Sequence, residues 1–209
     1  MSNDRPRVRI GLAKLESAQE ELRAALAQDG SLALPGIPEQ RARSALAVFR
    51  SALDWLEDTP YFEQAHSSLD KAGRQIRERF GCKLSFENGE YRQTCPVALA
   101  HKRVGLSIGA VVEESECSVC GEDPEDCVHI TGRAYDRAIS HQVITKAELL
   151  DVSIVSRPNQ PDARIQSISV PRSDLEQSLG PGFRFGIPVS CNRCLATCPG
   201  VQPFDGVHA

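Results

Sequence analysis

The segment that most constrains this chain carries four side chains of the types that bind zinc in proteins. It begins with a Cys-x2-Cys pair, Cys117 and Cys120, and continues with Cys127 and His129. Gly121 follows the pair directly and can adopt the positive φ that a tight turn around a metal often needs. Residues i and i+2 of an extended segment face the same side, so Cys127 and His129 can reach one ion together. The spacing predicts one zinc site with four protein ligands.

The cysteine pattern favours metal binding over disulfide formation. The chain has eight cysteines, and most of them fall in tight clusters, one of which includes a histidine. The N-terminal residues lead into an amphipathic segment and not into the apolar region of a secretory signal. Clustered cysteines in a reducing compartment indicate metal binding. We therefore expect a cytoplasmic protein that binds zinc at two sites.

Composition and charge argue against two other kinds of partner. The 209 residues are 41% hydrophobic and 25% charged, as in ordinary globular proteins. No apolar run approaches the roughly twenty residues of a membrane helix. The net charge is −4, and the seven acidic residues from Glu113 to Asp126 are not interrupted by Lys or Arg. Such a surface would repel a phosphate backbone, so we expect neither membrane nor nucleic-acid binding.

Apolar residues recur at helical spacing in the first eighty residues. The pattern predicts helices over residues 10–28, 38–58 and 61–80, and Gly81 is placed to end the third. Three amphipathic helices of this length favour an antiparallel bundle, which we assign to domain 1–80. His66 lies in the third helix with no cysteine at ligand spacing, so we predict a surface or partly packed residue there.

Alternating patterns typical of strands dominate the remaining domain, 81–209. Two short runs flank Asn88-Gly89, a strong hairpin signal, and their pairing would bring Cys82 near Cys95. A capping box beginning at Ser173 predicts a short helix. Further strands are predicted over residues 104–112, 149–156 and 164–170. The predicted fold class is α+β, a three-helix bundle followed by a zinc-stapled, β-rich, barrel-like domain.

A second cysteine cluster lies near the C-terminus. Cys191, Cys194 and Cys198 have the spacing of the last three cysteines of a bacterial ferredoxin motif, but Pro188 stands where a leading cysteine would be. Three thiolates need a further ligand, and four residues are candidates: Cys82, Cys95, His101 and His208. The two hairpin cysteines could also complete a four-cysteine site with Cys191 and Cys194. Zinc is the preferred metal because the first cluster includes a histidine, and an iron–sulfur cluster or unligated thiols are the alternatives.

Two segments resemble the phage prohead (capsid-maturation) serine protease family. Leu106-Ser-Ile-Gly109 is similar to the family's Ser-Ile-Gly strand. The segment Glu148-Leu-Leu-Asp-Val-Ser153-Ile-Val-Ser-Arg-Pro158-Asn-Gln-Pro161-Asp-Ala163-Arg-Ile is similar to its Leu-x-Glu-Val-Ser-x-Val-x-x-Pro-Ala-x-Pro-x-Ala segment. Some phage proteins of this type also resemble the chain in a Cys-Ser-x-Cys-Gly knuckle and a following His-x-x-Gly-x-x-Tyr.

The resemblance implies a β-barrel core, a catalytic serine at Ser153 and a histidine base from an upstream strand. His101 is the upstream histidine in the β half, although the family's Asn-His-Asp context is absent around it. A serine without a base within hydrogen-bond reach is not activated.

The sequence therefore supports two functions. The preferred one is a non-catalytic zinc protein that binds a protein partner, for which the resemblance suggests a phage structural or assembly protein. The alternative is a phage or prophage serine endopeptidase that uses Ser153 and His101.

Overall fold

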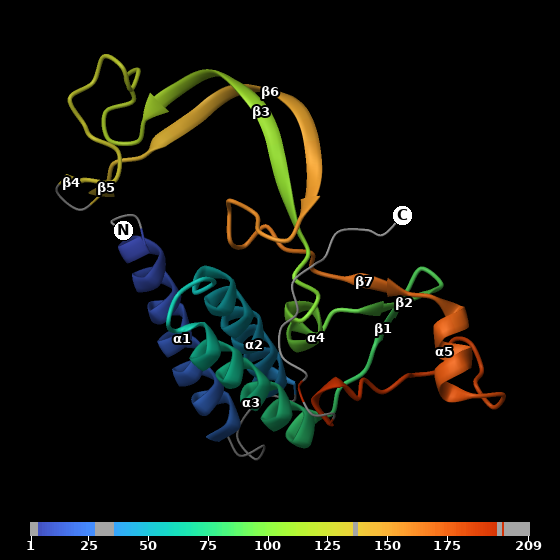
Figure 1. The fold of residues 1–209 in the computed structure, drawn as a ribbon. Coiled ribbons are helices and arrows are strands. Elements are labelled where there is room, and N and C mark those ends of the chain that lie inside the picture. Colours follow the sequence, from blue (N-terminus) through green and yellow to red (C-terminus); the bar gives the residue numbers. More distant parts are fainter. Residues whose placement is uncertain (1–3, 28–35, 136–137, 196–197, 199–209) are drawn as a thin grey trace. The chain divides into compact units, whose positions relative to one another are not determined.

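The computed structural model describes residues 4–27, 36–135, 138–195 and 198, and its contacts divide the chain into two units (Figure 1). Unit 1 combines residues 1–105 with 155–209, and unit 2 is residues 106–154. The division differs from the predicted boundary at residue 80, because short strands of both the middle and the end of the chain belong to the same unit as the helices. The predicted mixture of helices and strands is confirmed.

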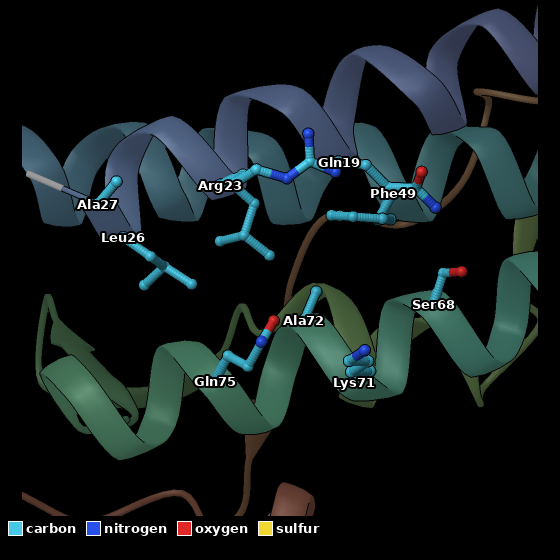
Figure 2. Close-up of a pocket in the computed structure, with 10 residues that line it drawn as sticks. Gln19, Arg23, Leu26, Ala27, Phe49, Ser68, Lys71, Ala72 and Gln75 are labelled. Atoms are coloured by element: carbon cyan, nitrogen blue, oxygen red, sulfur yellow. The ribbon is translucent and has the colours of Figure 1, made fainter.

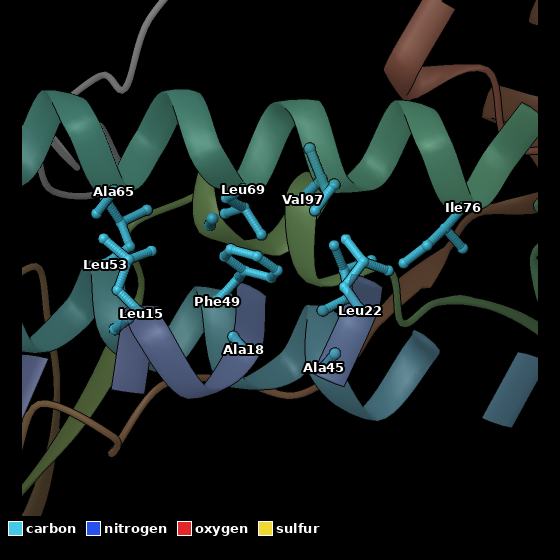
Figure 3. Close-up of a cluster of buried hydrophobic side chains, with 14 of the residues drawn as sticks. Leu15, Ala18, Leu22, Ala45, Phe49, Leu53, Ala65, Leu69, Ile76 and Val97 are labelled. Atoms are coloured by element: carbon cyan, nitrogen blue, oxygen red, sulfur yellow. The ribbon is translucent and has the colours of Figure 1, made fainter. Parts of the chain in front are cut away.

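Unit 1 is built on a bundle of three helices, as predicted. They are α1 (Asp4–Ala27), α2 (Ile37–Trp55) and α3 (Phe62–Phe80). Figure 3 shows Phe49 of α2 facing Leu69 of α3, with Leu22 of α1 in the same cluster, and all three side chains are at most 5% exposed. The short helix α4 (Pro96–Ala100) adds Val97 to the same core. Burial of this apolar stripe stabilises the bundle by about 25 cal/mol for each Å² removed from water.

A small antiparallel sheet completes unit 1. Its strands are β1 (Ser85–Glu87), β2 (Glu90–Gln93) and β7 (Ile168–Val170), in the order β1-β2-β7. The predicted hairpin is confirmed, with Asn88 at φ 53° and Gly89 at φ 78° in the turn. α5 (Arg172–Leu179) is also confirmed, but its N-cap is Pro171 without a side-chain cap, so the expected capping box does not form. The 3-10 turn η1 (Arg193–Leu195) lies in the C-terminal cysteine cluster.

A buried ion-pair network joins two segments of unit 1 to the C-terminal end of α2: the segment after α4, through Arg103, and the segment after unit 2, through Arg164. Arg103 donates to Asp54 at 2.8 Å, and Arg164 pairs with Asp54 at 3.4 Å and with Glu57 at 2.7 Å. Asp54 is 3% exposed, and its desolvation raises its pKa against the opposing effect of the three arginines around it. Because a buried charge that loses its partner is costly, this network fixes where the chain leaves α4 and where it returns after unit 2.

Unit 2 consists of two small sheets and the loops between them. The long strands β3 (Gly105–Cys117) and β6 (Gln142–Val155) form a two-stranded ribbon, and β4 (Ala134–Tyr135) pairs with β5 (Ala138–Ile139). The expected barrel is wrong for the described residues, because none of the three sheets closes on itself. Closure needs a continuous set of neighbouring strands, whereas β3 and β6 form a sheet of two strands. A single isolated bridge between Gly105 and Arg164 does not extend this sheet.

Candidate metal centres

The first candidate centre is a group that we call the knuckle: Cys117, Cys120, Cys127 and His129. The ligand atoms of these four residues all lie within 4.8 Å of one another. Cys117 is the last residue of β3, and the chain then turns so that the Gly121 N–H donates to the Cys117 carbonyl at 2.8 Å. Gly121 has φ 76°, as its position after the cysteine pair predicts. The turn thus holds the four predicted ligands in one group.

Backbone hydrogen bonds favour a thiolate in the knuckle. N–H groups of Val119 and Cys120 stabilise the ionised sulfur of Cys117 and lower its pKa to about 6. A backbone hydrogen bond at His129 lowers the pKa of Cys127, but burial and the hydrogen bond with the Cys117 thiol raise it more. Three neighbouring thiols do not ionise together without a cation, and a divalent metal would stabilise all three thiolates.

The histidine of the knuckle has a nitrogen that needs a partner. Nδ1 of His129 is buried and makes no hydrogen bond within the described residues. Its ring packs edge-to-face on Tyr135, with 4.5 Å between the ring centroids, and the Tyr135 hydroxyl accepts the Ile130 N–H at 2.8 Å. A buried polar atom without a partner costs about 1–3 kcal/mol, and metal coordination is one way to recover that cost.

The second candidate centre, which we call the mixed group, contains His66, Asp70, His101 and Cys198. Their ligand atoms also lie within 4.8 Å of one another. His66 and Asp70 lie one turn apart on α3, His101 is the C-cap of α4, and Cys198 follows η1. Nε2 of His101 is 3.1 Å from Nε2 of His66 and 2.9 Å from Sγ of Cys198. Adjacent ligand atoms of a tetrahedral zinc site are about 3.3–3.8 Å apart, so a small expansion would admit the ion.

A backbone hydrogen bond orients His101 toward the mixed group. Nδ1 of His101 is 2.6 Å from the Val97 carbonyl oxygen, which can only accept a hydrogen bond, so the proton is assigned to Nδ1. Nε2 then presents its lone pair toward His66 and Cys198. Burial lowers the pKa of His101, and the positive charge of Arg193 lowers it further, so the neutral, metal-binding form is favoured. The same arrangement is common for histidine ligands in metal sites.

The mixed group changes two of the sequence predictions. His66 was expected to be a surface or partly packed residue without ligands near it, but it is only 7% exposed and lies 3.4 Å from the sulfur of Cys198. Cys198 joins the histidines and not Cys191 and Cys194. The signal that could have indicated this group was the i, i+4 pair of His66 and Asp70 on one helix face.

The remaining cysteines lie elsewhere in unit 1. The thiol of Cys95 hydrogen-bonds with the thiols of both Cys191 and Cys194. Cys82 lies beside Cys191, whose N–H donates to the Cys82 carbonyl at 3.0 Å. His208, named as a possible further ligand, lies outside the described residues.

The two residues of the predicted peptidase site make other contacts. The Ser153 hydroxyl of unit 2 donates to the Asp151 carboxylate at 2.6 Å. In unit 1, both ring nitrogens of His101 are engaged within the mixed group and by Val97. Neither residue therefore has the contacts expected of a serine–histidine pair.

A pocket on the bundle has a different chemistry from the two metal centres. It opens between α1 and α3, and Figure 2 shows Arg23, Phe49 and Lys71 among the side chains around it. None of its lining residues is a cysteine, a histidine or an acid. Because the lining lacks the usual metal ligands, the pocket is not a candidate metal site.

Comparison with known proteins identifies no relative from which a function could be proposed. No protein-family model matches the chain, and no curated protein or solved structure is significantly similar to it. Among the described residues, the helices are all too short or too polar to cross a bilayer.

Proposed function

We propose that this chain is a zinc-binding protein in which the metal has a structural role. The observation that carries the proposal is the convergence of three cysteines and one histidine in the knuckle, with all ligand atoms within 4.8 Å. Thiolate and imidazole are the ligands that zinc prefers at tetrahedral sites. A site with four protein ligands has no open position for a reacting water, so the metal would hold the loop and not take part in catalysis.

The ribbon of unit 2 supports a role in protein binding. Apolar side chains of β3 and β6 are exposed, with Ile108 at 68%, Val152 at 54% and Ile154 at 64%. Val152 and Ile154 lie on one face of β6, because alternate residues of a strand point the same way. A two-stranded ribbon is marginally stable alone, and an exposed apolar face favours contact with another protein. We propose a protein partner, and the sequence resemblance suggests a phage structural or assembly protein.

The serine endopeptidase alternative has less support. Activation of Ser153 would require its hydroxyl to donate to a histidine nitrogen, whereas the hydroxyl donates to Asp151. His101 cannot easily serve both a metal and a proton transfer, because the same nitrogen lone pair would be needed for each. Labelling of Ser153 by a fluorophosphonate, or autocleavage that disappears in Ser153→Ala, would establish the alternative instead.

Metal analysis of two variants tests the zinc proposal. Cys127→Ser removes a knuckle ligand, so the purified protein should lose about one equivalent of zinc. Val128→Ser is the matched control, because Val128 lies between two ligands but is 87% exposed. It should retain the full metal content. Equal zinc content in Cys127→Ser and the unmodified chain would exclude a metal site at the knuckle.

Site-directed cross-linking tests the partner. A photo-reactive residue at Val152 should capture a phage structural or assembly protein in infected cells, and capture should fall when Ile108 and Ile154 are both changed to Ser. A photo-reactive residue at Leu179, on α5 and 50% exposed, is the control. Equal capture of the same protein from both positions would contradict binding through the ribbon.

A further inference from the structure

We propose that Cys82, Cys95, Cys191 and Cys194 form a third metal site, a four-cysteine site for a thiophilic divalent cation such as zinc. The run Cys191-x2-Cys194-x3-Cys198 would then serve two neighbouring centres, with Cys198 committed to the mixed group. This proposal concerns unit 1 and does not rest on zinc binding at the knuckle.

The backbone places Cys82 and Cys191 opposite each other. Lys83 and Ser190 form an isolated antiparallel bridge. A backbone hydrogen bond lies on each side of it: the Leu84 N–H donates to the Val189 carbonyl at 2.9 Å, and the Cys191 N–H donates to the Cys82 carbonyl at 3.0 Å. Cys82 and Cys191 are the next pair along this ladder. Directly paired residues project to the same face, with their Cβ atoms about 4.5–5.5 Å apart.

Cys95 links this pair to the Cys-x2-Cys turn. Its thiol hydrogen-bonds with those of Cys191 and Cys194, and its own position is fixed at the start of α4. Gln93 supports the arrangement, because its side-chain oxygen accepts the Cys95 N–H at 2.9 Å while its Nε2 donates to Sγ of Cys191 at 3.3 Å. An N–H donor to a cysteine sulfur is a common outer contact of metal thiolates. Cys95 before α4 and Cys194 in η1 are thus neighbours of the Cys82–Cys191 pair. Their ligand atoms are less tightly grouped than those of the knuckle and the mixed group, so a bound metal would draw the four thiols together.

The charges around the four cysteines also suit a metal site. Four thiolates with one divalent cation carry a net charge of −2, which nearby cations would stabilise. The Arg43 guanidinium hydrogen-bonds with the Cys82 thiol and donates to the Gly81 carbonyl at 3.0 Å. Arg77 donates to the Cys191 carbonyl and, at 3.1 Å, to the Asn192 side chain. The basic end of α3 is therefore used to hold the cysteine turn.

The proposed four-cysteine site and the mixed group lie at successive positions along one face of α3, because His66, Asp70 and Gly73 are spaced i, i+4 and i+7. Gly73 allows Cys194 to approach the helix, since a Cβ atom on Gly73 would lie 3.0 Å from Sγ of Cys194. Asp70 and His66 come earlier on the same helix and belong to the mixed group. Sγ of Cys198 is 2.9 Å from one histidine nitrogen and 3.4 Å from another, so this third cysteine of the run contacts both histidines of the mixed group.

Metal counting in the full-length chain tests this partition. The unmodified protein should hold about three zinc equivalents, one for each tetrahedral group. The pair of changes Cys82→Ser and Cys95→Ser should remove one equivalent, and the pair His66→Ala and Cys198→Ala should remove a different one. All four changes together should remove two. Loss of the same single equivalent in both double variants would overturn the proposal, as would retention of all the metal without Cys82 and Cys95.

Cobalt substitution provides a readout that does not depend on a Cys→Ser variant folding well. The sulfur-to-cobalt charge-transfer absorption grows with the number of thiolates on the ion, so a four-thiolate site has a strong band. Cys82→His keeps a ligand at this position, and it should weaken that band while the protein retains its cobalt. An unchanged spectrum in Cys82→His would contradict the site. A brown iron chromophore that needs Cys191, Cys194 and Cys198 together would also overturn it, in favour of an iron–sulfur cluster.

Discussion

At the scale of single residues, the turn that follows Cys117 stabilises the ionised form of its thiol. Two backbone N–H groups point at its sulfur, and they lower its pKa from 9.0 to about 6. Because folding lowers this pKa, the folded knuckle favours the thiolate. The Cys117 thiolate therefore stabilises the metal-free knuckle above pH 9, and this stabilisation is lost as the pH falls toward 6.

Titration of the metal-free protein checks this prediction. One thiolate should appear near pH 6 in the ultraviolet absorbance, well below the raised pKa of Cys127, and it should be missing in Cys117→Ser. Thermal melts of the metal-free protein should show unit 2 becoming less stable between pH 9 and pH 6. A first thiolate that appears only above pH 8 would contradict the role of the backbone N–H groups.

At the scale of the element, α3 depends on a glycine that a helix would normally disfavour. Alanine at position 73 would gain about 1 kcal/mol in helix propensity. Its Cβ would, however, lie 2.6 Å from Val97 Cγ2 and 3.0 Å from Cys194 Sγ. Overpacking of this kind costs about 1–3 kcal/mol, so Gly73→Ala should be destabilising and should weaken metal binding at the neighbouring cysteines.

Denaturant unfolding and metal analysis of Gly73→Ala measure both effects. Gly182→Ala is the control, because a Cβ there would meet no atom within 4 Å and its backbone is not left-handed. It should change the free energy of unfolding by less than about 0.5 kcal/mol. An increase in stability for Gly73→Ala would show that α3 and α4 can move apart at position 73 without a loss of packing energy.

The elements themselves could be predicted where the signal is local. Helix periodicity and the Asn88-Gly89 turn each specify a structure within a few residues, and both are confirmed. The spacing of the knuckle also brings its four residues together as predicted, whereas zinc binding there stays a prediction. For the mixed group, the sequence offers a local signal only in the i, i+4 pair of His66 and Asp70. Its full membership could not be predicted, because Cys198 is 132 residues from His66 and the packing of α3 against α4 and η1 brings them together. The barrel prediction was wrong because it needed the pairing of strands, which the local pattern does not contain. Alternation specifies strands but does not specify which strands pair.

At the scale of the whole molecule, the two units should respond separately to loss of the knuckle metal. Cys120→Ser removes a ligand from unit 2, whereas the core of the bundle and the buried ion pairs at Asp54 lie in unit 1. We expect hydrogen exchange to become faster in residues 106–154 and to stay slow in α2 and α3. Val128→Ser should leave both units protected. Equal loss of protection in α2 would show that the units unfold together.

A metal bound at the mixed group would also cross-link distant parts of the chain. A metal bound to both His66 and Cys198 would close a ring that contains both the hairpin of unit 1 and the whole of unit 2. By the loop-entropy relation for disulfides, a cross-link of this span lowers the conformational entropy of the unfolded chain and so raises its free energy by about 5 kcal/mol. Unlike a disulfide, this cross-link would open with a chelator or with acid, under conditions that break no covalent bond. The protein would then resist unfolding as a chain with a covalent cross-link does. Removal of the metal would reverse this stabilisation.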